Sequence, residues 1–196
     1  MIIGVPKESA AGETRVAMIP ETVAKWTKGG AEVVVEKGAG AAAGYLDDMY
    51  TAAGAKIVDS AKHVLGQADA VVKVQRPSLE EVAMMKDGAF LLSFVYPVQN
   101  LDLVKALNPK KITCYAMDAV PRISRAQVMD ALSSMATVAG YKAVLNAATK
   151  SVRFFPMLTT AAGTIAPAKV VILGVGVAGL QAIATARRRG ARRWLR

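Results

Sequence analysis

The stretch VVILGVGVAGLQAIATARRRGARRWLR, residues 170–196, contains the pattern that decides the fold of this chain. The apolar run Val170–Leu173 predicts a strand, and Gly174, Gly176 and Gly179 follow it at the spacing GxGxxG. In such a turn the first glycine permits a tight bend, the second lets backbone approach a pyrophosphate, and the third lets helix pack on strand. N–H groups at the start of the next helix would then face the phosphates. The context favours a dinucleotide-binding turn over a purely structural one.

The end of the chain departs from this pattern. A dinucleotide-binding unit continues into a second strand that ends in an acidic residue, about 20 residues after the glycines, for the adenosine ribose. Residues 190–196 read GARRWLR, with no β-rich run and no acid. We therefore expect an incomplete Rossmann lobe that keeps its first strand and helix only. A truncated or out-of-frame gene product would explain both the missing acid and the arginine-rich ending.

Composition and charge exclude several classes of protein. Hydrophobic residues make up 53% of the chain and charged residues 20%, which is typical of a globular protein. Residues 187–196 hold six of the 25 lysines and arginines, so 19 basic side chains stand against 15 acidic ones elsewhere, and most of the +10 net charge belongs to this ending. That distribution argues against nucleic-acid binding. No apolar run approaches the ~20 residues of a membrane span, and the N-terminus does not resemble an export signal. The single cysteine, Cys114, is interpreted as a buried hydrophobe in a reducing compartment.

Strands alternate with helices up to about residue 117. Several of the predicted strands are nearly continuous apolar runs, as in a parallel sheet covered on both faces. The predicted strands are 2–5, 32–36, 56–58, 70–75, 89–94 and 111–117. Pro20 indicates one helix start, and Ser78 with Glu81 predicts a capping box at another. The alternation predicts an α/β layered fold. Residues 126–149 then predict one long helix, and residues 151–167 a loop.

Three segments carry a family resemblance. GVPKE at 4–8 and ETRVAMIPETV at 13–23 resemble the N-terminal signature shared by alanine dehydrogenases and the alpha subunits of proton-translocating NAD(P) transhydrogenases. The segment AMDAVPRISRAQVMDALSSMATVAGYKAV, residues 116–144, is similar to the transhydrogenase members specifically. The glycine turn and its helix also match those members. The resemblance extends from residue 1 to about residue 188.

The resemblance implies how the chain is divided. Residues 1–125 would form a flavodoxin-like N-terminal lobe, residues 126–149 a connecting helix, and residues 150–196 a truncated Rossmann NAD-binding lobe. In the family the two lobes flank a cleft.

The resemblance also implies a nicotinamide site. Arg122, Gln127 and Asp130 match a family loop that reaches over the nicotinamide ribose and carboxamide, and they are the implied catalytic residues. Hydride passes directly between two nicotinamide rings, so the protein must orient the rings and exclude water. The residues implied to bind the cofactor are Arg122, Ile123, Ser124, Gln127, Val128, Met129, Asp130, Ser133, Gly174, Val175, Gly176, Val177 and Gly179. No metal site is expected.

Two positions distinguish the sister families. Arg15 and Lys73 match the residues with which alanine dehydrogenases hold the substrate carboxylate and carbonyl, but Tyr96 lies where the family's catalytic histidine falls. Without that imidazole no acid/base group for amino-acid oxidation is evident. His63, the single histidine, is predicted on a solvated helix face. The alanine dehydrogenase-like oxidoreductase is therefore the less favoured enzyme, and a non-catalytic remnant or assembly module is a further alternative.

The function that the resemblance implies is the NAD(H)-binding component of a proton-translocating NAD(P) transhydrogenase, an oxidoreductase. Its partners would be an NADP(H)-binding subunit and a membrane-spanning subunit that couples hydride transfer to proton translocation. A homodimer is implied, located in the cytoplasm and bound peripherally to the membrane through these partners. Because the adenosine half of the Rossmann lobe is missing, we expect this chain alone to bind NADH weakly or not at all.

Overall fold

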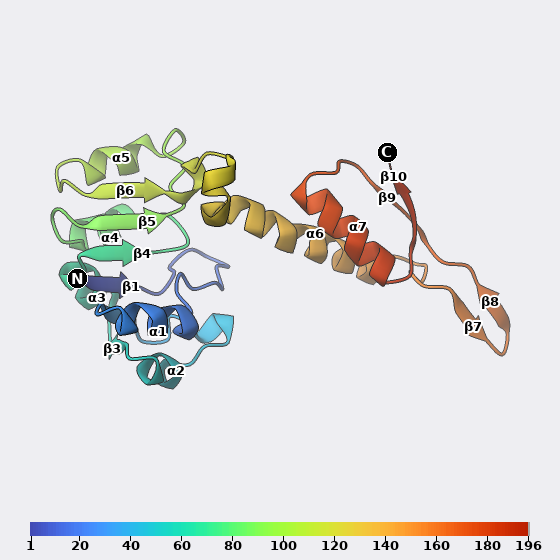
Figure 1. Ribbon diagram of the computed structural model, residues 1–196, viewed down its shortest axis with the longest axis horizontal. Coiled ribbons are helices and arrows are strands. Elements are labelled where there is room, and N and C mark those ends of the chain that lie inside the picture. The colour runs from blue at the N-terminus through green and yellow to red at the C-terminus, as the bar shows by residue number, and fades with distance from the viewer. Residues whose placement is uncertain (196) are drawn as a thin grey trace. The chain divides into compact units, whose positions relative to one another are not determined.

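The computed structural model describes the backbone of residues 1–195 and the side chains of residues 1–192 (Figure 1). The chain divides into two compact units, Met1–Pro121 and a second unit that begins at Arg122. None of the helices in this described part is long and apolar enough to cross a membrane.

The first unit is built on a parallel sheet of six strands. These are β1 (Ile2–Val5), β2 (Glu32–Glu36), β3 (Lys56–Val58), β4 (Ala70–Val72), β5 (Phe90–Ser93) and β6 (Thr113–Ala116). Their order is β3-β2-β1-β4-β5-β6, and every pairing is parallel. The predicted α/β fold with a parallel sheet is confirmed. This order is that of a doubly wound sheet, whose chain reverses direction across the sheet between β1 and β4.

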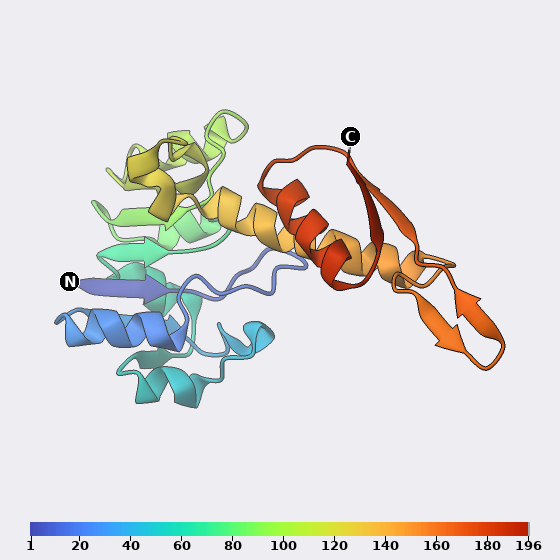
Figure 2. The same ribbon diagram turned by 45° about the vertical axis from the view of Figure 1, so that its right-hand side comes forward.

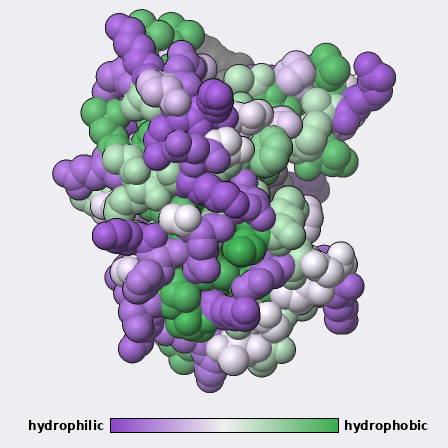
Figure 3. Space-filling model, turned by 90° about the vertical axis from the view of Figure 1, so that its left-hand side faces the viewer, coloured by the Kyte–Doolittle hydropathy of each residue, from purple (hydrophilic) through white to green (hydrophobic). Residues whose placement is uncertain are grey.

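Helices connect the strands of this sheet. They are α1 (Pro20–Lys28), α2 (Asp47–Ala52), α3 (Ala61–Gln67), α4 (Leu79–Met84) and α5 (Leu101–Leu107), with short 3₁₀ turns η1 (Ala41–Ala43) and η2 (Met117–Ala119). Ser78 and Glu81 form the predicted capping box of α4. One apolar core joins α3, α4 and α5 to the sheet through Val71 and Leu91, and a second surrounds the fully buried Tyr50. The end of the unit where the strands begin presents a largely hydrophilic surface with separate apolar groups (Figure 3).

The predicted strand 70–75 ends early, at Val72. The reason is a carboxylate from the other side of the chain reversal: Glu8 accepts hydrogen bonds from the N–H groups of Val74 (2.6 Å) and Gln75 (3.2 Å). These two donors are therefore satisfied by a side chain and not by a neighbouring strand. Strands β5 and β6 are also shorter than predicted, by one or more residues at each end.

A buried ion cluster holds this region together. The Lys73 ammonium has no exposed surface and lies 2.7 Å from Oε1 of Glu81 and 3.8 Å from Oε2 of Glu8. Burial raises the pKa of Glu8 above its usual value, although the Lys73 charge and the N–H groups of Val74 and Gln75 oppose that shift. Lys73 thus neutralises carboxylates that could not otherwise stay charged in the interior.

The second unit consists of two packed helices, a parallel strand pair and a hairpin (Figure 2). Its elements are η3 (Ser124–Met129), α6 (Ala131–Lys150), β7 (Leu158–Thr160), β8 (Gly163–Ile165), β9 (Lys169–Ile172), α7 (Val177–Arg188) and β10 (Arg192–Leu195). Strands β9 and β10 pair in parallel, and β7 pairs with β8 in antiparallel fashion. The core between α6 and α7 includes Val144, Phe155, Ala182 and Ala186.

Three expectations for this unit are wrong. A second strand does follow the glycine-turn helix: β10 pairs with β9, and the Arg192 N–H donates to the Ala168 carbonyl at 2.9 Å. Composition did not reveal it, because the strand owes its hydrogen bonds to its neighbour and not to β-rich side chains. The segment 151–167, predicted as loop, contains the β7–β8 hairpin. The long helix begins at Ala131, five residues later than predicted, because Asp130 caps it.

Replacing Lys73 with alanine should destabilise the first unit by about 3–5 kcal/mol, because two buried carboxylates lose their counter-charge. The matched control is Lys56→Ala, which removes an ion pair of the same length to Glu32 (2.7 Å) on an exposed surface. That change should cost less than about 1 kcal/mol. Urea unfolding followed by circular dichroism measures both, and equal losses would contradict the role given to Lys73.

Candidate functional site

The turn between β9 and α7 offers open space and free donors. Gly174 has φ of 91°, in the left-handed region that favours glycine. Gly176 is the N-cap of α7, and a Cβ atom built there would meet nothing within 4 Å. No side chain caps this helix, so the N–H groups of its first turn lack helical partners. A helix start of this kind binds anions such as phosphates.

The third glycine of the turn has the opposite surroundings. A Cβ atom on Gly179 would overlap the carbonyl oxygen of Gly174 and lie 2.9 Å from its carbonyl carbon. Backbone therefore rests directly on backbone at this point. The first turn of α7 is held against the end of β9 only because residue 179 has no side chain.

The segment before α6 presents polar groups at the start of that helix. Asp130 is the N-cap: its carboxylate accepts hydrogen bonds from the Ser133 N–H (2.9 Å) and the Ser133 hydroxyl (2.6 Å). These bonds, with a smaller contribution from the Arg122 charge, hold the pKa of Asp130 below its usual value. Ala126 is buried and anchors η3, whereas the neighbouring Val128 is 93% exposed. Apolar surface of that kind is available to a ligand or a partner.

A cavity of about 360 Å³ joins the two segments. Its lining residues are Arg122, Leu132, Ser133, Ala136, Leu173, Gly174, Gly176, Val177, Ala178 and Gly179. The structure thus brings Arg122 and Ser133 together with the glycine turn. Gln127 and Asp130 belong to the same unit but do not line this cavity, and the same holds for Ile123, Ser124, Val128, Met129 and Val175.

Four lining residues were not singled out in the sequence: Leu132, Ala136, Leu173 and Ala178. Ala136 could have been found, because it lies three residues after Ser133 and therefore on the same face of α6. Ala178 lies between glycines already assigned to the turn. For Leu132 and Leu173 no comparable sequence signal exists, since apolar residues next to an element usually belong to the core.

The first unit holds the charges that would serve an alanine dehydrogenase. Arg15 donates two hydrogen bonds to Glu13, at 2.7 Å and 2.6 Å, and these bonds are the main reason that the pKa of Glu13 is lowered to about 2. Lys73 is buried in the ion cluster with Glu81 and Glu8. Both cations therefore already hold carboxylates of this chain.

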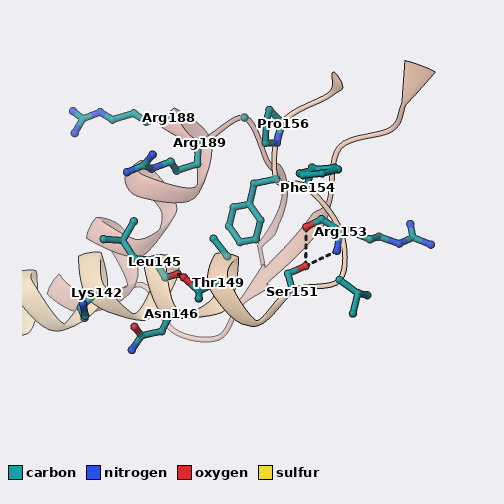
Figure 4. A pocket seen from close by; sticks show the side chains of 14 residues that line it. Lys142, Leu145, Asn146, Thr149, Ser151, Arg153, Phe154, Pro156, Arg188 and Arg189 are labelled. Carbon is teal, nitrogen blue, oxygen red and sulfur yellow. Dashed lines mark hydrogen bonds between the residues drawn. The ribbon is translucent and has the colours of Figure 1, made fainter. Parts of the chain in front are cut away.

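A larger hollow of about 1030 Å³ lies at the other end of the second unit (Figure 4). Its walls are the last turns of α6 and α7 and residues 151–156, close to where β9 begins. Ligands of open α/β sheets bind at the opposite end, beyond the carboxyl ends of the strands. Arg188 and Arg189 extend to one side and Arg153 to the other, so their charges do not converge on one point. We therefore assign the site to the cavity at the glycine turn.

Comparison with protein families gives two adjacent matches. The model described as "Alanine dehydrogenase/PNT, N-terminal domain" matches residues 4–139. The model described as "Alanine dehydrogenase/PNT, C-terminal domain" matches residues 143–193.

Individual relatives agree with these matches. The chain is 54% identical over 196 residues to an NAD(P) transhydrogenase subunit alpha of Rhodospirillum rubrum, covering 97% of this chain and 51% of that protein. It is 35% identical over 185 residues to alanine dehydrogenase of Methanococcus maripaludis, covering 93% of this chain and 49% of that protein. The crystal structure of transhydrogenase from Sinorhizobium meliloti superposes with a TM-score of 0.95 at 44% identity, covering all of this chain and 58% of that one. The chain spans about half the length of the curated relatives it matches.

The second and third glycines of the turn should respond differently to alanine. Gly179→Ala should destabilise the second unit by about 1–3 kcal/mol, because its methyl group collides with the Gly174 carbonyl. Gly176→Ala should cost up to about 1 kcal/mol, because its methyl group enters open space and alanine is only a poorer N-cap. Thermal unfolding of the two variants measures this difference. Equal stabilities would show that the close backbone contact at Gly179 is not required.

The hydroxyl of Ser133 should control the ionisation of Asp130. Because the folded pKa is lowered, the stabilisation of α6 by this carboxylate is present above the unfolded pKa and is lost as pH falls through the folded pKa. Ser133→Ala should raise the pKa of Asp130 and move that loss to higher pH. Ser134→Ala is the control, because the Ser134 hydroxyl bonds the backbone carbonyl of Asp130 and not its carboxylate. Carboxyl-carbon NMR against pH measures both, and an unchanged pKa in Ser133→Ala would refute the assignment.

Proposed function

The chain belongs to the alanine dehydrogenase/PNT family, and on that basis we propose that it is the NAD(H)-binding component of a proton-translocating NAD(P) transhydrogenase. The observation that carries this proposal is the cavity in which the glycine turn meets Arg122 and Ser133. The greater identity to transhydrogenase alpha subunits than to alanine dehydrogenases supports it. So does the engagement of Arg15 and Lys73 by carboxylates of this chain, which leaves neither cation free for an amino-acid substrate.

The residues of the cavity fit a dinucleotide. Gly176 leaves the room that a pyrophosphate needs, and the uncapped N–H groups of α7 supply donors for its oxygens. Arg122 lines the same cavity and provides a cation at its rim. We assign the remaining cofactor-binding role to the segment from Ile123 to Asp130, together with Val175. Its amide, hydroxyl and carboxylate groups suit a ribose and a carboxamide.

The chemistry of the bound cofactor is hydride transfer between NAD(H) and NADP(H). The task of this chain in that reaction is orientation and exclusion of water, since no proton has to be delivered to the reacting carbon. Arg122, Gln127 and Asp130 are the residues we assign to that task. The Asp130 carboxylate stays ionised to low pH because Ser133 stabilises its charge and lowers its pKa, so it offers a steady acceptor.

The proposal includes partners for this chain. An NADP(H)-binding subunit would supply the second nicotinamide, and a membrane-spanning subunit would couple the transfer to proton translocation. The chain would lie on the cytoplasmic face of the membrane, bound peripherally through these subunits, and would form a homodimer. The name "subunit alpha" of the Rhodospirillum rubrum relative supports an assembly of several subunits.

NMR titration with NADH tests the proposal directly, even for weak binding. Adding NADH to the ¹⁵N-labelled chain should shift the amide signals of Val175–Gly179 and of residues 122–130, with millimolar affinity or weaker. Gly176→Ala should abolish these shifts, because its methyl group fills the phosphate space. NADPH should produce smaller shifts than NADH.

Signals of the first unit provide the internal control. Buried Val23 and Leu91 should not respond to NADH. If millimolar NADH moved no signal in the glycine turn, the NAD(H)-binding proposal would fail, and a non-catalytic assembly module would be the better interpretation. Shifts confined to the surroundings of Arg15 and Tyr96, induced by alanine or pyruvate, would instead favour an alanine dehydrogenase-like enzyme.

A further inference from the structure

One face of α6 runs along the nucleotide cavity and then along α7. Ser133, Ala136, Gly140 and Val144 follow each other at intervals of three or four residues and so lie on a single side of the helix. Ser133 and Ala136 line the cavity. Val144 is 4% exposed and belongs to the core shared with α7. Gly140, between them, is buried.

The backbones of the two helices are in direct contact at Gly140. A Cβ atom built there would overlap the carbonyl oxygen of Ala178 and lie 2.9 Å from its carbonyl carbon and 3.0 Å from its Cα. These are backbone atoms of α7, which cannot rotate away as a side chain could. Ala182 and Ala186 continue the contact surface of α7 at intervals of four residues, and both are buried. Small residues on both helices thus allow the close approach, and Gly140 is its tightest point.

The position of this contact is what gives it a functional consequence. Ala178 lies in the first turn of α7, two residues after the N-cap Gly176, and it lines the nucleotide cavity. The backbone of that turn also carries the N–H donors assigned to the pyrophosphate. The opposite wall of the cavity is formed by Ser133 and Ala136, one to two turns before Gly140 on α6. The separation of the two walls is therefore set by how closely α6 and α7 approach at residue 140.

We propose that Gly140 is a positioning residue for the nucleotide: by letting α6 touch the Ala178 peptide, it fixes the phosphate turn at the distance from Ser133 that a dinucleotide requires. This inference rests on the proposed function, because it concerns the same cavity. Gly140 itself touches no ligand. It acts through the first turn of α7.

The variant Gly140→Ala tests this proposal with two independent readouts. Without nucleotide, the added methyl group should push α7 away, and the amide signals of Val175–Gly179 should move. With NADH, the Kd should rise several-fold, and the shifts that NADH induces in the turn should shrink. The matched control is Gly66→Ala in α3, a glycine inside a helix whose Cβ would have its nearest neighbour, the Met84 carbonyl oxygen, at 3.8 Å. That variant should leave both readouts unchanged.

The two readouts separate this inference from the proposed function. If the wild-type chain did not bind NADH, the proposed function would fail, yet the nucleotide-free signals would still show whether Gly140 fixes the turn. If the wild-type chain bound NADH and Gly140→Ala folded with unchanged turn signals and unchanged Kd, the positioning role would be overturned.

A second variant covers the case in which Gly140→Ala does not fold. Val144→Ala weakens the packing of α6 and α7 but leaves the Gly140 contact intact, one turn away. The proposal expects its turn signals and its Kd for NADH to remain at wild-type values. If Val144→Ala moved the turn signals of Val175–Gly179 and raised the Kd, general packing of the helix pair would position the turn, and the proposal for Gly140 would be overturned.

Discussion

Two contacts of backbone against backbone determine the second unit. Residue 179 rests on the Gly174 carbonyl, and residue 140 rests on the Ala178 carbonyl, so neither position has room for even a methyl group. The first contact holds α7 against the end of β9, and the second holds α6 against α7. Because protein interiors are close-packed, such contacts fix the separation of the elements more sharply than side-chain packing does. The cavity at the glycine turn owes its width to them.

The first unit depends on a different kind of constraint. Its chain reversal between β1 and β4 brings carboxylates and cations to the same edge of the sheet, where ligands of doubly wound sheets usually bind. Here Glu8 satisfies the N–H groups after β4, and Lys73 neutralises Glu8 and Glu81 in the interior. Arg15 is engaged by Glu13. The groups that could hold a small acid are thus used to stabilise the fold, and the anion-binding features of the chain are found in the second unit.

The electrostatics of the second unit suit a cofactor that carries negative charge at one end only. The start of α7 is uncapped and has no acidic residue in its first turn, so its positive end remains available. The start of α6 is capped by Asp130, whose charge is stabilised by Ser133. Phosphates are therefore favoured at α7, and hydroxyl or amide donors at α6. This asymmetry agrees with the orientation proposed for the dinucleotide.

The sequence by itself determined the elements whose causes are local. Apolar runs placed the strands, Ser78 and Glu81 placed a helix start, and the glycine spacing placed the turn between β9 and α7. It could not place β10 or the β7–β8 hairpin, since each of these strands exists because a neighbouring strand supplies its hydrogen bonds. For the candidate site, the sequence and its family resemblance supplied Arg122, Ser133 and the glycines. Only the tertiary structure placed Ala136 and Ala178 beside them and showed that Gly140 touches α7, because contacts between segments distant along the chain leave no periodic pattern within either segment.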